Sequence, residues 1–341
     1  MKRKCFIGIR ILCFLTLCIC IMYYLSNVLT ATQLEEYPQR NAFWQYMNAE
    51  EDNTIDIMFV GDSTIMHAIN PMQIWKDTAI TSYVMSYSMM KPQEAYFDMK
   101  KLLDKQSPKY VILDTAFLVN IVPDEFDYGR DTTRNIVNYI DDEFVGEIDY
   151  YLPVMKYKSA WKTRHFSDLL MSHPKSINNI FKGYKYAPEI IPYLGEHGEK
   201  TNGIVKYRNN GDLYFDKLFH LCKENNSELI LISCPHRKGW NYEKYMKIKL
   251  LSDKYNVIYF DYDVNLEKSI PDFSWEIDTK DGGDHLNYSG ATKTTDVFID
   301  DFIEKYKPCK TKLTERQKDK WNRDMNEFYS FTIDKQYSKM Q

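Results

Sequence analysis

Blocks of hydrophobic and polar positions alternate along the chain and predict strands and helices in turn. Short apolar runs bounded by Gly or polar residues are typical of buried parallel strands. Five such runs occur, at residues 55–60, 82–85, 110–113, 229–232 and 257–260. Apolar residues recur at helical spacing over residues 92–105, 213–222 and 291–306. This alternation predicts an α/β domain with a parallel five-stranded sheet covered on both faces.

Two segments depart from the alternation. Residues 118–210 carry no strong strand pattern and are rich in Tyr, Trp and charged residues. We expect a helical insertion there, folded over one edge of the sheet, either as a wall or lid facing a substrate or as extra packing. Residues 314–331 carry apolar side chains at helical spacing among many charges, which predicts an amphipathic C-terminal helix packed on the domain.

The beginning of the chain has a different character. No charged residue occurs between Arg10 and Glu35, and an uncharged run of that length can cross a bilayer as a helix. Basic residues precede the run, so the N-terminus should stay in the cytoplasm and the rest should be exported. The alternative is a cleaved signal peptide. The length of the run, with Tyr23 and Tyr24 at its outer end, favours an uncleaved anchor.

These patterns divide the chain into four parts. We expect a transmembrane anchor at residues 1–30 and a juxtamembrane linker at 31–53. The α/β domain should occupy 54–307, with the insertion at about 118–210 inside it. A C-terminal helix and tail should follow at 308–341.

Composition and charge narrow the class of protein. The 341 residues are 44% hydrophobic and 27% charged, which suits a globular core, and the net charge of −4 gives no support for nucleic-acid binding. Four of the seven cysteines lie in or beside the anchor. The others are widely spaced, so we expect neither a disulfide framework nor a metal site, and no cofactor. Cys222 and Cys234 form either a disulfide or, as we favour, two buried thiols.

A serine lies at the first strand-to-helix turn. Gly61, Asp62 and Ser63 follow the first predicted strand directly. A serine there lies at a helix N-terminus, which favours developing negative charge. Asp and Ser are also ordinary capping residues, so the motif alone is weak evidence.

A histidine lies at the opposite end of the domain. His285 follows the last strand in a Gly-rich loop and precedes the helix at 291–306. A general base needs such a place, anchored at an element boundary yet free to point across the sheet edge. Asp281 and Asp284 are both candidates for the carboxylate that orients the imidazole. The two motifs together predict a site in which His285 activates Ser63.

On these residues the chain resembles the SGNH, or GDSL-type, hydrolase superfamily. The Gly-Asp-Ser motif matches the family's first block, and His285 with Asp281 or Asp284 matches the last block, normally Asp-x-x-His. Strict spacing would place the aspartate at Gly282, whereas Asp281 lies four residues before the histidine. We prefer Asp281, with one extra residue in the loop, because the adjacent Asp284 would reach the imidazole less easily.

The resemblance extends to membrane-anchored bacterial members of the superfamily, such as those of D-alanine transfer and alginate O-acetylation. Residues 286–291 resemble the His-Leu-Asn form of the last block, and residues 70–75 and 183–184 are also similar to those members. The resemblance implies an SGNH, flavodoxin-like three-layer α/β/α fold over about residues 55–306.

Other family features are not recognisable. The second-block glycine and third-block asparagine, which help to form the oxyanion hole, have no clear match. Residues 86–88 and Asp114–Thr115 stand roughly where those blocks should be. We therefore expect the oxyanion hole to rest mainly on the Ser63 backbone N–H and a neighbour.

The remaining histidines have no ligand spacing that would suggest a metal. His67 lies one helical turn beyond Ser63, and we expect a place on the helix face rather than a role in shaping the pocket. His236 follows the fourth strand on the functional edge of the sheet. It could bind substrate, but we favour an ordinary loop position.

Two functions follow from the resemblance. The first is a membrane-anchored, extracytoplasmic serine esterase or O-acyltransferase that acts through an acyl-Ser63 intermediate. Its substrate would be acyl, most simply acetyl, esters of cell-envelope polysaccharide or another small acyl ester, and the near-neutral charge of the chain fits an uncharged sugar ester. A membrane-bound O-acyltransferase would be its partner. The second is a non-catalytic scaffold or carbohydrate-binding accessory of such an acyltransferase.

Overall fold

The computed structural model describes residues 2–31, 38–119, 178–195, 211–237, 242–308 and 310–340. They belong to two compact units. One comprises Met1–Ala49 and Pro123–Ile177, and the other comprises Glu50–Val122 and Asn178–Gln341. The second unit contains the sheet and the candidate site.

The first unit has two described helices, α1 (Lys2–Ala31) and α2 (Pro38–Met47). In α1, the stretch Phe6–Leu25 is long and apolar enough to cross a membrane, and none of it is buried within the protein. A signal sequence near an N-terminus would have the same length and composition.

The sheet has five parallel strands in the order β2-β1-β3-β4-β5. Their bounds are β1 (Ile57–Gly61), β2 (Ser82–Ser86), β3 (Tyr110–Asp114), β4 (Glu228–Ser233) and β5 (Tyr259–Asp261). The chain leaves β1 toward β2 on one side and reaches β3 on the other, so the crossovers change direction beside β1. Parallel sheets of this order bind ligands outside the carboxyl ends of the strands at that switch point.

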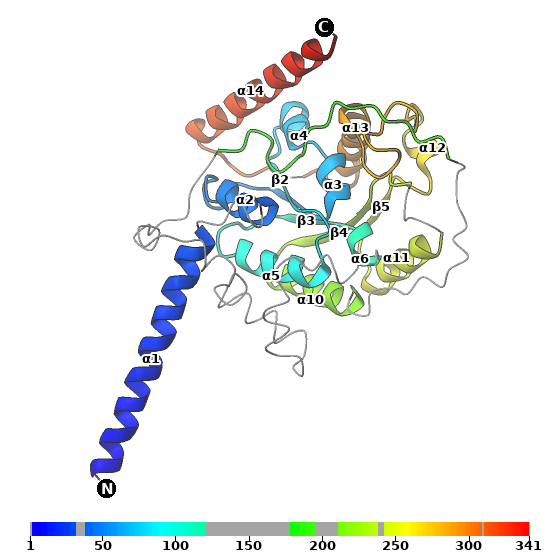
Figure 1. Ribbon diagram of the computed structural model, residues 1–341. Coiled ribbons are helices and arrows are strands. Elements are labelled where there is room, and N and C mark those ends of the chain that lie inside the picture. Colours follow the sequence, from blue (N-terminus) through cyan, green and yellow to red (C-terminus); the bar gives the residue numbers. More distant parts are fainter. Residues whose placement is uncertain are drawn as a thin grey trace. The chain divides into compact units, whose positions relative to one another are not determined.

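Helices cover both faces of the sheet (Figure 1). On one face lie α3 (Ser63–Ala68), α4 (Pro71–Thr78) and α13 (Tyr288–Tyr306). On the other face lie α5 (Pro92–Leu102), α10 (Gly211–Glu224) and α11 (Tyr242–Tyr255). Two short helices, α6 (Ala116–Val119) and α12 (Leu266–Ser269), follow β3 and β5. The predicted three-layer α/β/α fold is confirmed.

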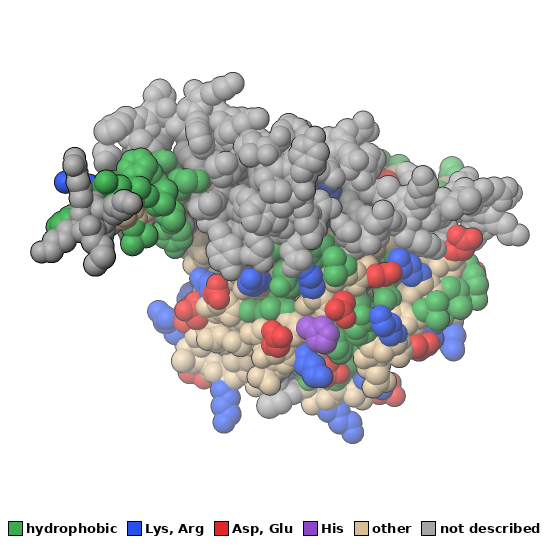
Figure 2. Space-filling view, turned by 90° about the horizontal axis from the view of Figure 1, so that it is seen from below, with side chains coloured by type: hydrophobic (Ala, Val, Ile, Leu, Met, Phe, Trp, Pro, Cys, Tyr) green, Lys and Arg blue, Asp and Glu red, His purple; other side chains and the backbone are tan. Residues whose placement is uncertain are grey.

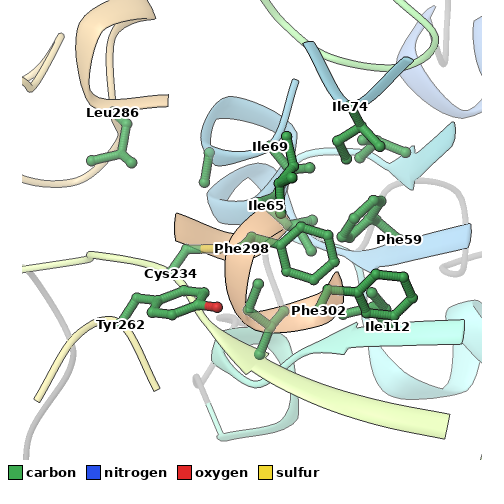
Figure 3. Close-up of a cluster of buried hydrophobic side chains, with 14 of the residues drawn as sticks. Phe59, Ile65, Ile69, Ile74, Ile112, Cys234, Tyr262, Leu286, Phe298 and Phe302 are labelled. Atoms are coloured by element: carbon green, nitrogen blue, oxygen red, sulfur yellow. The ribbon is translucent and has the colours of Figure 1, made fainter. Parts of the chain in front are cut away.

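Aromatic packing holds α13 against the sheet. Figure 3 shows Phe298 and Phe302 between the sheet and the helices of this face. The Phe298 ring meets the Phe59 ring of β1 edge to face, with 5.2 Å between centroids. Burying one such side chain contributes about 1.5–3 kcal/mol. Because α13 begins three residues after His285, this packing also fixes the loop that carries the histidine.

The two cysteines of the domain are free thiols, as favoured from the sequence. Cys222 and Cys234 are both buried and unpaired. Burial raises the pKa of the Cys222 thiol to about 12 and that of Cys234 well above its ordinary value. Both therefore stay protonated and act as small hydrophobic side chains.

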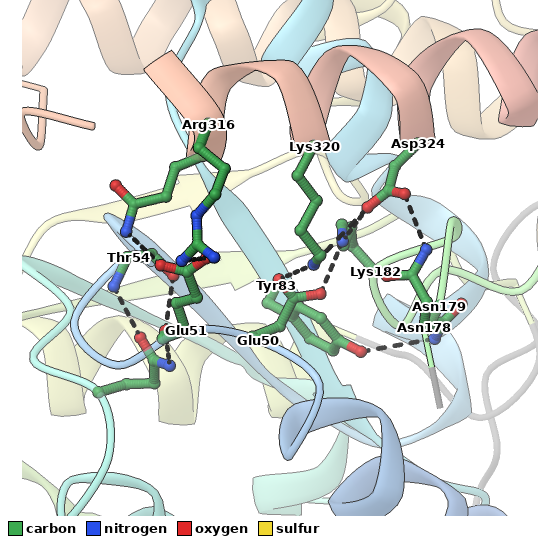
Figure 4. A network of polar contacts seen from close by, with 12 residues as sticks. Glu50, Glu51, Thr54, Tyr83, Asn178, Asn179, Lys182, Arg316, Lys320 and Asp324 are labelled. Carbon is green, nitrogen blue, oxygen red and sulfur yellow. Dashed lines mark hydrogen bonds and ion pairs between the residues drawn. The ribbon is translucent and has the colours of Figure 1, made fainter. Parts of the chain in front are cut away.

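The predicted C-terminal helix is present as α14 (Glu315–Met340) and packs on the second unit through the buried Trp321 and Phe328. A buried ion cluster ties it to the end of the insertion (Figure 4). Lys182 lies 2.6 Å from Glu50 and 2.6 Å from Asp324 of α14, and its side chain is 0% exposed.

The insertion predicted at 118–210 is described only in part. Residues 178–195 form turns and extended chain with no helix, and residues 120–177 and 196–210 lie outside the described residues. The four-part division of the chain stays a prediction for the same reason.

Figure 2 shows the underside of the view in Figure 1. Lys and Arg side chains are interspersed there with Asp and Glu. Within the described part of this face, neither sign of charge dominates, in keeping with the net charge of −4. A nucleic-acid surface would gather basic side chains on one face.

Candidate active site

Ser63 is the first residue of α3, directly after the carboxyl end of β1. The Asp62 side chain caps this helix by accepting a 2.8 Å hydrogen bond from the Thr64 backbone N–H. Gly61 is required because a Cβ there would lie 2.5 Å from the Cβ of Asp114, at the end of the neighbouring β3. The Gly-Asp-Ser sequence thus makes a tight turn that leaves the serine at the switch point of the sheet.

His285 is held by the loop in front of α13. Asn287 caps α13, since its side chain accepts a hydrogen bond of 3.1 Å from the Gly290 backbone N–H. Thr279 and Leu286 form an isolated antiparallel bridge across the base of the loop. These contacts fix both ends of the segment that carries Asp281 and His285.

The structure brings Ser63, His285 and Asp281 into one hydrogen-bonded chain. The Ser63 Oγ lies 2.8 Å from Nε2 of His285, and Nδ1 of His285 lies 2.6 Å from Oδ2 of Asp281. The His285 backbone N–H also donates to Oδ1 of Asp281 at 2.8 Å. One carboxylate therefore fixes both the ring and the backbone of the histidine.

Asp281 is held in its ionised form. Partial burial opposes ionisation, but hydrogen bonds from His285 and from Lys280 outweigh it and hold the pKa of Asp281 well below its usual range. The Lys280 Nζ donates to Oδ2 at 3.0 Å. A permanent negative charge at Nδ1 selects the tautomer whose Nε2 can accept a proton from Ser63.

Asp284, the second candidate, lies elsewhere. Its Oδ1 is 3.5 Å from Nε2 of His236, whereas Nδ1 of His285 contacts Asp281. The loop accommodates the extra residue because Gly282 and Gly283 adopt positive φ angles of 72° and 92°. The preference for Asp281 agrees with this geometry.

His67 lies closer to the site than expected. Its ring packs against that of His285 with 5.0 Å between centroids, and its side chain is 3% exposed. Burial is the main cause that lowers the pKa of His67 to about 2, so the ring stays neutral. His67 follows Ser63 by four residues on one helix face, and that spacing is the signal that could have placed it at the site.

His236 also lies beside the site rather than in an uninvolved loop. Its Nδ1 is 3.4 Å from Oγ1 of Thr64, the residue after the serine. Its backbone N–H donates to Oδ1 of Asp263 at 2.7 Å. With its contact to Asp284, the side chain of His236 bridges the serine turn and the histidine loop.

The residues that stand at the expected oxyanion blocks differ in whether they can donate a hydrogen bond to an oxyanion. The Thr115 hydroxyl is engaged with the Ser233 hydroxyl at 2.5 Å. The Asp114 carboxyl is buried, and burial together with the nearby Asp62 raises its pKa well above the usual range. Ser86 ends β2 opposite Gly61, and its buried hydroxyl has no hydrogen-bond partner among the described residues. The candidate donors are therefore the Ser63 backbone N–H and the Ser86 hydroxyl.

The described end of the insertion forms one wall of the site. The Lys185 backbone N–H donates to the Met66 carbonyl of α3 at 2.9 Å, and the Tyr288 N–H donates to the Ala187 carbonyl at 2.7 Å. Further on, the Gly282 N–H donates to the Ile191 carbonyl at 3.1 Å. Residues 178–195 thus connect the serine helix to the histidine loop, which the sequence pattern did not reveal.

The described residues contain no group of three or more His, Cys, Asp or Glu side chains placed to hold a metal ion. What the site does contain is a hydroxyl, an imidazole and an ionised carboxylate in series, which suits nucleophilic attack with general-base assistance.

Among known proteins, similarity is found with solved structures. No protein-family model matches the chain, and no curated protein matches it. Among solved structures, the chain is similar to a GDSL-like lipase from Bacteroides thetaiotaomicron, at 10% identity and a TM-score of 0.35, covering 81% of this chain and 98% of that one. It is also similar to the esterase EstA from Pseudoalteromonas, at 8% identity and a TM-score of 0.35, covering 73% and 97%.

A third similar structure is an acetyl-xylooligosaccharide esterase from Geobacillus, at 11% identity and a TM-score of 0.33, covering 74% of this chain and 95% of that one. Because these TM-scores lie below 0.5, the fold assignment stands on the strand order and the site geometry given above.

Proposed function

We propose that this protein is a membrane-anchored, extracytoplasmic serine esterase or O-acyltransferase of the SGNH type. The observation that carries the proposal is the continuous chain from Ser63 Oγ to His285 at 2.8 Å and from His285 to Asp281 at 2.6 Å. Its place at the carboxyl end of β1, where this sheet order forms ligand sites, supports the same function.

In the first half-reaction, Ser63 Oγ attacks the carbonyl carbon of an acyl ester while His285 Nε2 takes the hydroxyl proton. Asp281 stabilises the imidazolium that forms. The Ser63 N–H and the Ser86 hydroxyl are candidates to bind the oxyanion. When the tetrahedral intermediate collapses, His285 returns the proton to the departing alkoxide, and the acyl group remains on Ser63.

In the second half-reaction, water or a hydroxyl of an acceptor attacks the acyl-Ser63 carbonyl. His285 Nε2 takes the proton from the attacking oxygen and returns it to Ser63 Oγ as the ester bond breaks. Water as the attacking group gives hydrolysis, and a sugar hydroxyl gives transfer. Exclusion of water from the site would favour transfer.

For the substrate, we propose acyl esters, most simply acetyl, on cell-envelope polysaccharide. The apolar α1 would anchor the domain to the outer face of the cell membrane, close to such polymers. A membrane-bound O-acyltransferase would supply the acyl group. These assignments rest on the resemblance to anchored bacterial members of the superfamily.

The alternative, a non-catalytic carbohydrate-binding accessory, is favoured by one observation, namely that no glycine or asparagine of the family's oxyanion blocks is recognisable here. Hydrolysis of 4-nitrophenyl acetate by the full chain distinguishes the two. For the enzyme, Ser63→Ala and His285→Gln should each lower kcat by about 10³-fold or more. Ser289→Ala, which removes an exposed hydroxyl at the start of α13, is the matched control. Equal rates for Ser63→Ala and the unaltered chain would overturn the enzyme proposal.

A further inference from the structure

A lysine extends the hydrogen-bonded chain of the site beyond Asp281. The Lys280 Nζ donates to Oδ2 of Asp281 at 3.0 Å, and the same oxygen lies 2.6 Å from Nδ1 of His285. The other oxygen of the carboxylate, Oδ1, accepts the His285 backbone N–H at 2.8 Å. The carboxylate that orients the imidazole is therefore shared between the histidine and a cation.

The backbone holds Lys280 at the base of the histidine loop. Its N–H donates to the His285 carbonyl at 3.1 Å, and the flanking residues Thr279 and Leu286 form the isolated bridge. Lys280 and His285 are thus fixed opposite each other across the loop. The side chain of Lys280 is 22% exposed and that of Asp281 is 30% exposed, so solvent screens the contact between their charges only in part.

The ammonium opposes the effect of the Asp281 charge on the imidazole. An ionised carboxylate at Nδ1 by itself favours the imidazolium form of a histidine. A cation on the same oxygen disfavours that form, because it places two positive charges close together. An imidazolium has no lone pair at Nε2 with which to take the Ser63 proton. The lysine therefore favours the form of His285 that can act as a base.

Charged and titratable side chains from neighbouring elements also lie beside the histidine loop, and all of them are unchanged when position 280 is varied. They include His67 of α3, with Lys185 of the insertion beside it, and His236 and Arg237 after β4. Burial is the main cause that lowers the pKa of His67 to about 2, so its ring stays uncharged at the pH values of an esterase assay. Within the loop, Asp284 lies 3.5 Å from His236. Substitutions at position 280 alone therefore isolate the effect of the lysine.

We propose that Lys280 is a positioning residue of the triad, whose ammonium charge on Asp281 keeps the His285 imidazole unprotonated, and so able to act as a base, at lower pH. The inference rests on the proposed function and deepens it by naming a group that sets the pH range of the site. The oxygen of Asp281 that receives both the ammonium and the imidazole carries the inference. Lys280 acts through this carboxylate and not on the substrate.

The pH dependence of kcat/KM for 4-nitrophenyl acetate tests the proposal, because this substrate does not itself titrate. The acidic limb of such a profile reports an ionisation of the free enzyme. Lys280→Gln keeps a hydrogen-bond donor but removes the charge, and its acidic midpoint should move upward by about one pH unit. Below both midpoints, kcat/KM should then be about tenfold lower than in the unaltered chain, and above them it should stay within about threefold.

A rescue and a control accompany this variant. Lys280→Arg restores the charge and should bring the midpoint back to within about 0.3 pH units of the unaltered chain. Lys268→Gln removes the same charge from the exposed side of α12 and should leave the midpoint within the same margin.

Three outcomes would overturn the inference. The first is a midpoint that does not move in Lys280→Gln, or moves as far in Lys268→Gln. The second is a midpoint in Lys280→Arg as high as that in Lys280→Gln. The third is a loss of kcat/KM in Lys280→Gln by the same factor at every pH, because the lysine would then serve only to hold the loop in place.

Nuclear magnetic resonance separates this inference from the proposed function. In the Ser63→Ala chain, the His285 imidazole is titrated through its ring-proton signal, which is identified by its absence in His285→Gln. Its midpoint should be about one pH unit higher when Lys280→Gln is added. If no ester is turned over but this difference is found, Lys280 controls the charge of His285 and the enzyme proposal fails. If esters are turned over but the two chains titrate together, the Lys280 inference fails alone.

Discussion

Asp281 holds His285 through its ring and its backbone, whereas Asp284, one residue before the histidine, faces His236. Loss of one or the other of these two carboxylates should therefore affect kcat differently. We predict that Asp281→Asn lowers kcat for 4-nitrophenyl acetate by about 10³–10⁴-fold, because the amide favours the wrong imidazole tautomer. Asp284→Asn is the matched control and should stay within about tenfold, since the Asp284 carboxylate faces His236. Equal losses for the two variants would refute the assignment of Asp281.

The Ser86 hydroxyl is the second candidate donor to the oxyanion. If its unpaired hydroxyl completes the oxyanion hole, Ser86→Ala should lower kcat by about 10²–10³-fold with little change in KM, because the hydrogen bond strengthens only in the transition state. Ser88→Ala, two residues further along, is the control. Steady-state kinetics with 4-nitrophenyl acetate measures both. Full activity of Ser86→Ala would show that other donors bind the oxyanion.

At the scale of elements, the strands and the helices that flank the site follow from the sequence. Each predicted strand appears within about two residues of its position, because short buried runs in a parallel sheet must be apolar throughout. Helices α4 and α11 were not predicted. In α11 only a few positions are buried among many charges, so its periodicity is weak.

Two features of the site could not be predicted from the sequence. The choice between Asp281 and Asp284 depends on positive φ angles at Gly282 and Gly283, which a glycine permits but does not require. The wall formed by residues 178–195 depends on backbone hydrogen bonds, which carry no sequence signal. Ser63 and His285 were predictable because each lies at the boundary of a strongly patterned element.

Asp263, in the loop after β5, should make the free energy of unfolding depend on pH. Burial raises the pKa of Asp263 in the folded protein to about 7, above its unfolded value near 3.8. The folded state therefore favours the protonated form, and its stabilising contribution is complete below pH 3.8 and is lost as the pH rises toward 7. Between about pH 5 and 7, the free energy of unfolding should fall by up to roughly 1.4 kcal/mol per pH unit more in the unaltered chain than in Asp263→Asn. Urea unfolding at the two pH values measures this, and parallel curves for both chains would contradict it.

At the scale of the whole molecule, α14 is joined to the wall of the site by the buried Lys182 cluster (Figure 4). Lys320 of α14 adds a second contact to Glu50 at 2.7 Å, and the Lys182 ammonium lies 4.8 Å from the Trp321 ring centroid. The Lys182 carbonyl also accepts the Val84 N–H of β2 at 2.9 Å. The C-terminal helix thus braces the segment that connects the serine helix to the histidine loop.

Loss of the Lys182 charge should therefore weaken the whole second unit. Lys182→Met removes the fully buried cation and leaves Glu50 and Asp324 with Lys320 as their remaining partner, so it should lower the free energy of unfolding by about 3–5 kcal/mol. Arg316→Gln, which removes an exposed ion pair of the same helix with Glu51, should cost about 1 kcal/mol or less. Denaturant unfolding compares the two, and a similar small loss in both would mean that the cluster does not brace the fold.

Covalent labelling shows whether Ser63 is a nucleophile activated by His285. The folded full-length protein is treated with a fluorophosphonate, and the intact mass and the labelled peptide are determined. We expect one phosphonyl adduct per chain, located on Ser63, absent in Ser63→Ala and much slower to form in His285→Gln. Folded protein that takes up no label, or a Ser63→Ala chain that is labelled as fast as the unaltered one, would contradict it.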